Sequence, residues 1–202
     1  MVTRRPRAAS AVLALALAVA AAAAGKTSMT TSEVYQRAVP ILAGLLSDAT
    51  RQGLPVPVRR GEALRLAVIV CPVVIGGPNG TVIGVPTHVG EFALATGELD
   101  ELRTVTPAEF GQPVAPDGVL GTWQPAPELT FARVRELRAQ LFADLDILLP
   151  AFARDDRAPA APVVEAARRF EPAFALLGEP PLAPWYRALG RDFFDWLDRL
   201  PR

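Results

Sequence analysis

The longest hydrophobic run after the N-terminal leader is residues 64–75, LRLAVIVCPVVI. Val and Ile favour an extended backbone, and both alternating sets of positions are apolar. One set is Leu66, Val68 and Val70, and the other is Ala67, Ile69 and Cys71. A strand that is apolar on both faces is usually covered on both. A buried helix is the alternative, but the run is short and β-branched. The pattern therefore predicts a central strand that ends near Cys71, because Pro72 lacks an N–H.

An N-terminal helix is predicted over residues 31–51. Thr30 and Glu33 have the spacing of a capping box, and apolar residues follow at helical spacing. They are Val34, Ala38, Ile41, Leu42, Leu45, Leu46 and Ala49. We expect a kink at Pro40, and we expect residues 54–61, rich in Pro and Arg, to form a connector.

Short strands are predicted after the central one, at residues 81–85, 91–95 and 99–105. The Asn79-Gly80 pair favours a turn after the central strand, and Thr96-Gly97-Glu98 marks the next turn. Phe92 and Leu94 are expected to point inward. The result is an antiparallel meander of three or four strands.

The C-terminal part is predicted to be helical after a connector rich in Gly and Pro at residues 111–127. A first helix at 127–149 should end at Pro150, and residues 151–162 should form a mobile linker. A second helix follows from residue 163 to 177. A third begins at Pro184, and its apolar positions share one face: Trp185, Leu189, Phe193, Trp196 and Leu200. Such a face is either an internal docking face or a partner-binding face, and we expect the internal one.

These elements predict the α+β class, because strands and helices are segregated along the chain. We expect a small antiparallel three- to four-stranded meander with an N-terminal helix, followed by a C-terminal three-helix region. Residues 29–202 would be one domain. Residues 29–112 would form its helix and sheet part, and residues 127–202 its helical part.

The first 25 residues have the order of a bacterial signal peptide. Arg4, Arg5 and Arg7 precede an uncharged, Ala-rich run. We therefore expect an exported protein, periplasmic or extracellular, with a membrane role only if the leader is retained. The alternative is misassigned upstream translation, with a cytoplasmic protein that starts at Met29.

Charge argues against nucleic acid as the main partner. Four of the 21 basic residues lie at or before Lys26, so 17 basic residues face 21 acidic ones in the body, a net charge of −4. Phosphate binding needs clustered Arg or Lys. The single cysteine excludes an internal disulfide and a Cys-cluster metal site, and we predict no cofactor.

Candidate chemistry is sparse. Cys71 and His88 are the only Cys and His, but nothing pairs them, and Cys71 is expected in the core. Asp192, Asp195 and Asp198 could bind a cation or a basic partner, although ion pairs with Arg191 and Arg199 are the simpler interpretation. No catalytic, cofactor-binding or metal-binding residue is predicted. Trp185 and Trp196, with the three aspartates, are the candidate partner-binding residues.

Asp144 and Asp146 lie near the predicted end of their helix, where the macrodipole disfavours acids. Either an external partner or tertiary neighbours must balance them. The scarcity of catalytic polar residues favours a non-enzymatic bacterial protein-binding or accessory module, of an inhibitor- or immunity-like kind. The alternatives are a small-molecule carrier with an apolar pocket between sheet and helices, and an enzyme that relies on carboxylates and Arg.

Overall fold

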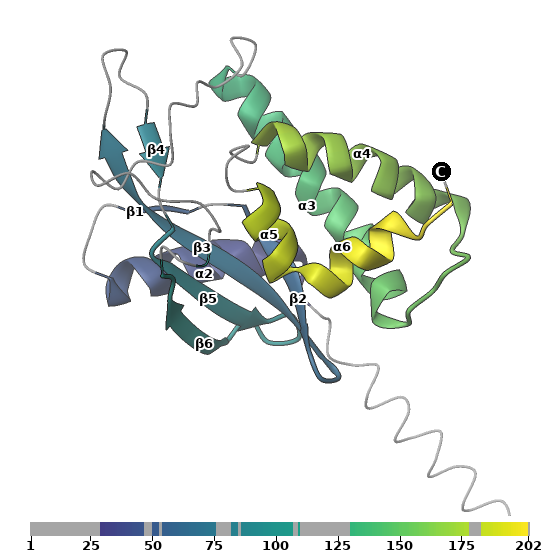
Figure 1. Cartoon of the computed structure of the whole chain (residues 1–202), viewed down its shortest axis with the longest axis horizontal. Coiled ribbons are helices and arrows are strands. Elements are labelled where there is room, and N and C mark those ends of the chain that lie inside the picture. The colour runs from purple at the N-terminus through teal and green to yellow at the C-terminus, as the bar shows by residue number, and fades with distance from the viewer. Residues whose placement is uncertain are drawn as a thin grey trace, which may run out of the picture.

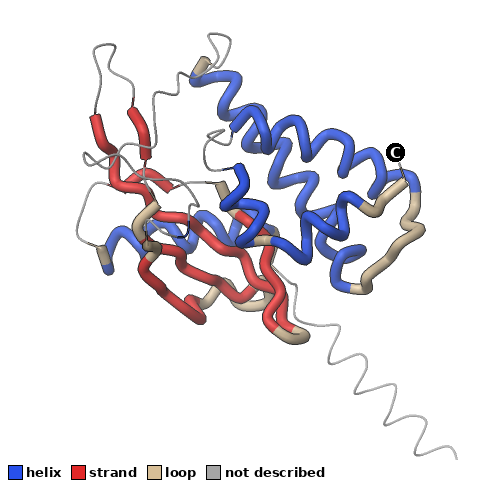
Figure 2. Tube along the Cα trace, viewed as in Figure 1, coloured by secondary structure: helices blue, strands red, loops and turns tan. Residues whose placement is uncertain are grey.

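The computed structural model describes residues 29–46, 50–52, 54–75, 82–84, 86–106, 109, 130–177 and 183–201. It shows the predicted α+β fold: one helix, a sheet, and then a helical region (Figures 1 and 2). The predictions for the leader, the Asn79-Gly80 turn and the connector at 111–127 lie outside the described residues. So does the side chain of Cys71.

The central strand is confirmed as β3 (Ala63–Ile75), and all its pairings are antiparallel. It pairs with β1 (Thr50–Gln52), β2 (Val56–Arg60), β4 (Val82–Gly84) and β5 (His88–Ala93), and β5 pairs with β6 (Leu99–Thr104). The strands predicted at residues 81–85, 91–95 and 99–105 correspond to β4, β5 and β6, but β4 and β5 each pair with β3 and not with each other, so only part of the expected meander is present. Among the described residues the sheet has six strands rather than three or four.

Two expectations about prolines in the sheet were wrong. β3 continues through Pro72, which pairs with Thr50 of β1. Pairing with β5 has already ended at Val70, so the missing N–H of Pro72 disturbs little of the ladder. The expected connector at 54–61 contains β2, in which Pro57 is tolerated because this strand pairs only with β3 in the described part of the sheet.

Both faces of β3 are covered, as its two apolar sets predict. Leu66, Val68 and Val70 pack with α2 (Thr31–Leu45) in one core cluster. Ala67 and Ile69 belong to the second cluster, which contains most of the apolar residues of the C-terminal helices. In Figure 1, α2 lies behind the sheet and the C-terminal helices lie beside and above it.

The start of α2 is confirmed by its capping box. The Thr30 hydroxyl accepts a hydrogen bond from the Glu33 N–H at 3.2 Å, and the Glu33 carboxylate accepts one from the Thr30 N–H at 2.8 Å. The hydrogen bonds that this carboxylate accepts from the Thr30 N–H and from the Thr30 hydroxyl hold the pKa of Glu33 below its ordinary value. Pro40 lies inside the helix, which ends at Leu45 rather than at residue 51.

The described residues of the C-terminal region form four helices in place of the three expected. They are α3 (Phe131–Ala153), α4 (Ala161–Leu177), α5 (Ala183–Leu189) and α6 (Arg191–Asp198). Pro150 does not end α3; it is exposed within the last turn, where water can solvate the carbonyl it leaves free. None of the helices in these described ranges is both long and apolar enough to cross a membrane.

The last predicted helix is divided at Gly190, where the chain touches β2. A Cβ atom at this position would lie 2.5 Å from Val56 Cγ1 and 2.9 Å from the Pro57 carbonyl oxygen. Only glycine allows this approach. The break leaves most of the predicted stripe on the inside: Trp185, Phe193, Trp196 and Leu200 are buried, and Leu189 is half-buried. The internal docking face is therefore confirmed.

Candidate functional site

Two carboxylates in the described structure are fully buried, those of Glu91 and Asp144, and Glu91 is the one in the sheet. Glu91 lies in β5 opposite Ala67 of β3 and Glu101 of β6. Its place in the strand puts it on the same face as Val89, which belongs to the helix-covered core. A buried carboxylate is strongly unfavourable unless charged donors satisfy it.

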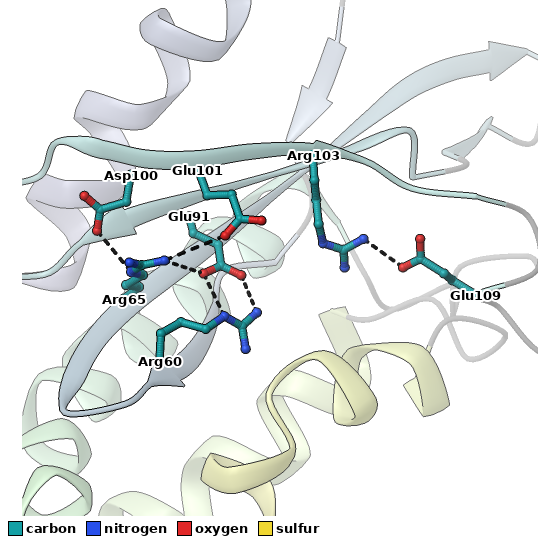
Figure 3. Close-up of polar contacts among 7 residues, drawn as sticks. All are labelled: Arg60, Arg65, Glu91, Asp100, Glu101, Arg103 and Glu109. Atoms are coloured by element: carbon teal, nitrogen blue, oxygen red, sulfur yellow. Dashed lines mark hydrogen bonds and ion pairs between the residues drawn. The ribbon is translucent and has the colours of Figure 1, made fainter.

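Two arginines supply those donors (Figure 3). Arg60, at the end of β2, donates through Nε to Glu91 Oε2 at 3.1 Å, and its Nη2 bonds the other carboxylate oxygen. Arg65 of β3 donates through Nη1 to Glu91 Oε2 at 3.3 Å. The bidentate contact fixes the plane of the Arg60 guanidinium as well as its position. The Arg60 side chain nevertheless remains 43% exposed, so its outer donors can still reach a partner.

Acidic residues of β6 border the two arginines. Arg65 Nε lies 3.0 Å from Asp100 Oδ2, although this N–H does not have hydrogen-bond geometry, and its Nη1 lies 3.8 Å from Glu101 Oε2. The contacts of Arg65 to Asp100 and Glu101 are near the surface and add little to stability. They do place opposite charges side by side on an open part of the sheet.

Farther along β6, Arg103 Nη1 donates to Glu109 Oε2 at 2.9 Å. Glu109 also accepts hydrogen bonds from the Thr106 N–H at 3.0 Å and from the Trp185 side chain of α5. Burial raises the pKa of Glu109, but the bonds from Thr106 and Arg103 outweigh it and hold this pKa below its ordinary value. Glu109 thus connects β6 to the C-terminal helices.

We call these seven residues the charged surface. They are Arg60, Arg65, Glu91, Asp100, Glu101, Arg103 and Glu109. The surface has three positive and four negative groups, so its net charge is small. Each arginine lies against at least one carboxylate. Fixed hydrogen-bond donors and acceptors of this kind can bind complementary charged groups.

A cavity of about 210 Å³ adjoins the charged surface between β2 and the junction of α5 with α6. Its lining includes Arg59 and Arg60 on the strand and Leu189, Arg191 and Asp192 on the helices. Asp192 is the one predicted aspartate that comes next to the charged surface. Small-molecule sites usually have volumes of about 300–1,000 Å³, so this cavity is small for a ligand pocket.

The other predicted aspartates lie elsewhere on α6. Asp198 accepts a hydrogen bond from Arg187 of α5 at 3.1 Å, and Asp195 is exposed. Arg199, expected to pair with Asp195, lies 4.0 Å from Asp155. The structure therefore does not bring the three aspartates together around one point.

Trp185 and Trp196 face the protein interior. Trp196 packs against Phe152 and Phe193, and its Nε1 donates to the Asp156 carbonyl at 2.9 Å. This bond also fixes the segment that was expected to be a mobile linker. Trp185 contributes to the charged surface only indirectly, through its bond to Glu109.

Tertiary neighbours balance the two acids of α3. Asp144 is fully buried and accepts two hydrogen bonds from Arg169 of α4, at 2.6 and 3.2 Å. Asp146 accepts from the Thr31 N–H at 2.7 Å and from its hydroxyl at 2.8 Å. Its charge lies at the N-terminus of α2, where the macrodipole favours it.

Catalytic arrangements are scarce in the described residues. No three His, Cys, Asp or Glu residues there come together as a metal site requires. His88 Nδ1 lies 3.1 Å from the Thr87 hydroxyl, which gives it a structural contact.

The sequence-based interpretation missed Glu91 because β5 was treated as having one solvated face, with Phe92 inward. The signal was present in β3, whose two apolar faces require cover on both sides. A glutamate on a neighbouring strand then needs a charged partner, and Arg60 and Arg65 were within reach.

No family model, no curated protein and no solved structure matches the chain.

Proposed function

We propose that this protein is a non-enzymatic accessory module that binds another protein through the charged surface. The observation that carries the proposal is the fully buried Glu91 carboxylate, which holds the guanidinium groups of Arg60 and Arg65. A buried ion pair is weak evidence of a stabilising role, because desolvation offsets its Coulomb energy. The buried Glu91 can instead serve to hold two arginine side chains in place, and such a role would account for the energetic cost of burying its carboxylate.

Fixed arginines suit a protein interface for two reasons. Arginine is enriched in interfaces and among their energetically dominant residues. Immobilising a flexible side chain on binding costs about 0.5–1.5 kcal/mol, and Glu91 has already ordered Arg60. The expected partner presents a carboxylate to Arg60 and a basic group to Asp100 and Glu101.

The leader supports a place for this activity outside the cytoplasm. Its basic, apolar and small-residue order is that of an export signal. N-terminal sequencing of the native protein tests this: a chain that begins near residue 25 supports export, and a cytoplasmic chain that begins at Met29 contradicts it.

The test of binding is differential capture from the native lysate. Wild-type protein, Arg60→Ala and Asp100→Asn are immobilised, with Arg168→Ala as the matched control because Arg168 is exposed on α4. We expect a protein that wild type and the control both retain, and that Arg60→Ala retains at least tenfold less. Raising the salt concentration should weaken its capture, because screening reduces interactions between surface charges.

Thermal melting of each variant separates lost binding from lost folding. If Arg60→Ala proves unstable, Asp100→Asn carries the comparison, because Asp100 is exposed. A partner retained equally by wild type and both surface variants, or no protein that distinguishes them, contradicts the proposal.

A further inference from the structure

β6 forms one edge of the described sheet. β6 ends the strand order of the sheet, and within the described ranges its only partner strand is β5. The opposite side of the sheet differs, because Gly190 between α5 and α6 lies against Val56 and Pro57 of β2. An edge strand with unpaired N–H and C=O groups is a template for another strand.

The register identifies which backbone groups of β6 face outward. The Val105 N–H donates to the Thr87 carbonyl at 2.7 Å, and Arg103 is paired with Val89 and Leu102 with Gly90. Hydrogen-bonded and non-hydrogen-bonded pairs alternate along an antiparallel ladder. The backbone groups of residues 101, 103 and 105 therefore face β5, and those of Leu102 and Thr104 face away from it.

We propose that β6 pairs antiparallel with β6 of a second copy of this chain, centred on Leu102. In this register Leu102 lies opposite Leu102 of the second copy, and Asp100 lies opposite Thr104. The outward backbone groups of Leu102 then pair at the centre of the new ladder, which extends to Thr104 on one side and to the register shift at Asp100 on the other. Glu101 of each copy lies opposite Arg103 of the other, in the non-hydrogen-bonded position where side chains are closest.

Charge selects this register over its neighbours. Shifting the centre to Glu101 or to Arg103 keeps the outward groups paired, but it places two identical charges opposite each other, which is destabilising. Charges on an edge strand often prevent pairing. Here, however, Glu101 and Arg103 on either side of Leu102 carry opposite charges, so pairing of two copies brings unlike charges together.

The side chains at the edge are suited to this contact. Leu102 is 36% exposed, one of a few large apolar side chains on the described surface, and it would pack against its copy. Glu101 is 49% exposed and Arg103 31%. Arg103 already bonds Glu109, but a guanidinium has five N–H donors and can accommodate a second carboxylate.

Dimerisation would join two sheets into one and occupy Glu101 and Arg103 of each charged surface, which leaves Arg60 for the proposed partner. The inference does not depend on the proposed partner protein, because it concerns only copies of this chain. The short paired edge implies a weak, reversible dimer, since small interfaces are usually transient.

Analytical ultracentrifugation of the purified full chain tests the proposal across a hundredfold concentration range. We expect a reversible monomer–dimer equilibrium for wild type. E101R and R103E should each weaken dimerisation at least tenfold, and the charge-swapped double variant E101R/R103E should restore it. E98R is the matched control, because Glu98 is exposed just before β6, and it should dimerise as wild type does.

Mixing the two single variants gives a decisive measurement. E101R carries only positive charge at positions 101 and 103, and R103E carries only negative charge there, so the mixture should form a heterodimer although neither variant self-associates. Its formation also shows that both variants are folded. A wild-type chain that stays monomeric throughout, a dimer insensitive to E101R and R103E, or a mixture that stays monomeric overturns the proposal.

Discussion

Replacing Trp196 by alanine tests whether the C-terminal helices are part of the protein's own core. The Trp196 side chain is 1% exposed, and its ring centroid lies 5.6 Å from that of Phe152 and 6.0 Å from that of Phe193. Its Nε1 also donates to the Asp156 carbonyl at 2.9 Å. The substitution removes both the packing and this hydrogen bond.

The expected loss is a large part of the total stability. A buried tryptophan removes about 150–250 Å² from water, or roughly 4–6 kcal/mol at about 25 cal/mol per Å². Measured Trp→Ala changes in cores cost about 3–5 kcal/mol, and a lost hydrogen bond about 1 kcal/mol. Domains are stable by only about 5–15 kcal/mol. We therefore expect Trp196→Ala to lower the free energy of unfolding by about 3–5 kcal/mol.

Urea unfolding, followed by circular dichroism, and thermal melting provide the measurement. At about 2–4 °C per kcal/mol, the melting temperature should fall by roughly 8–16 °C for a loss of about 4 kcal/mol. Trp196→Phe should keep most of the packing and lose the bond to Asp156, at a smaller cost. A Trp196→Ala protein that melts within error of wild type would refute the reasoning, and would make this helix face a partner-binding site instead.

Three further predictions concern single contacts. Gly190→Ala should lower the free energy of unfolding by about 1–3 kcal/mol because its Cβ meets β2, whereas Gly44→Ala, in open space within α2, should raise it by about 0.5–1 kcal/mol in the same urea titration. Asp146→Ala should cost about 1–2 kcal/mol by removing the acceptor of the Thr31 N–H, and Asp146→Asn should cost less; equal stability of all three proteins at low salt would contradict this. The lowered pKa of Glu109 means that its ionised form stabilises the fold above the unfolded pKa, and that this stabilisation is lost as the pH falls through the folded pKa. The stability difference between wild type and Glu109→Gln should therefore be largest above about pH 5 and shrink toward about pH 3, and a pH-independent difference would be evidence against it.

The predictable parts of the fold are those whose structure is determined by residues close together in the sequence. β3 is apolar on both faces from Leu66 to Cys71, and Thr30 and Glu33 satisfy each other within one turn. The failures have tertiary causes. β2 contains Pro57 and resembles a loop until β3 pairs with one of its edges, and Gly190 resembles an ordinary helical glycine until β2 lies against it.

The charged surface was less predictable than the fold, because its residues come from separate strands. Arg60, Arg65 and Glu91 are ordinary strand-end or alternating residues until the register of β2, β3 and β5 brings them together. The tryptophans and aspartates of the last helices were more conspicuous in the sequence. Burial explains the tryptophans, however, and contact with Arg187 explains Asp198.

The bond from Asp146 to α2 has a consequence for the order in which the chain can fold. Thr31 and Asp146 are separated by 115 positions, and synthesis adds about 5–20 residues per second, so roughly 6–23 s pass between them on the ribosome. During that interval the first turn of α2 has only its own capping box. The helix that is synthesised first among the described elements is therefore completed only when α3 arrives, and protection of its early amides from hydrogen exchange should depend on the C-terminal helices being in place.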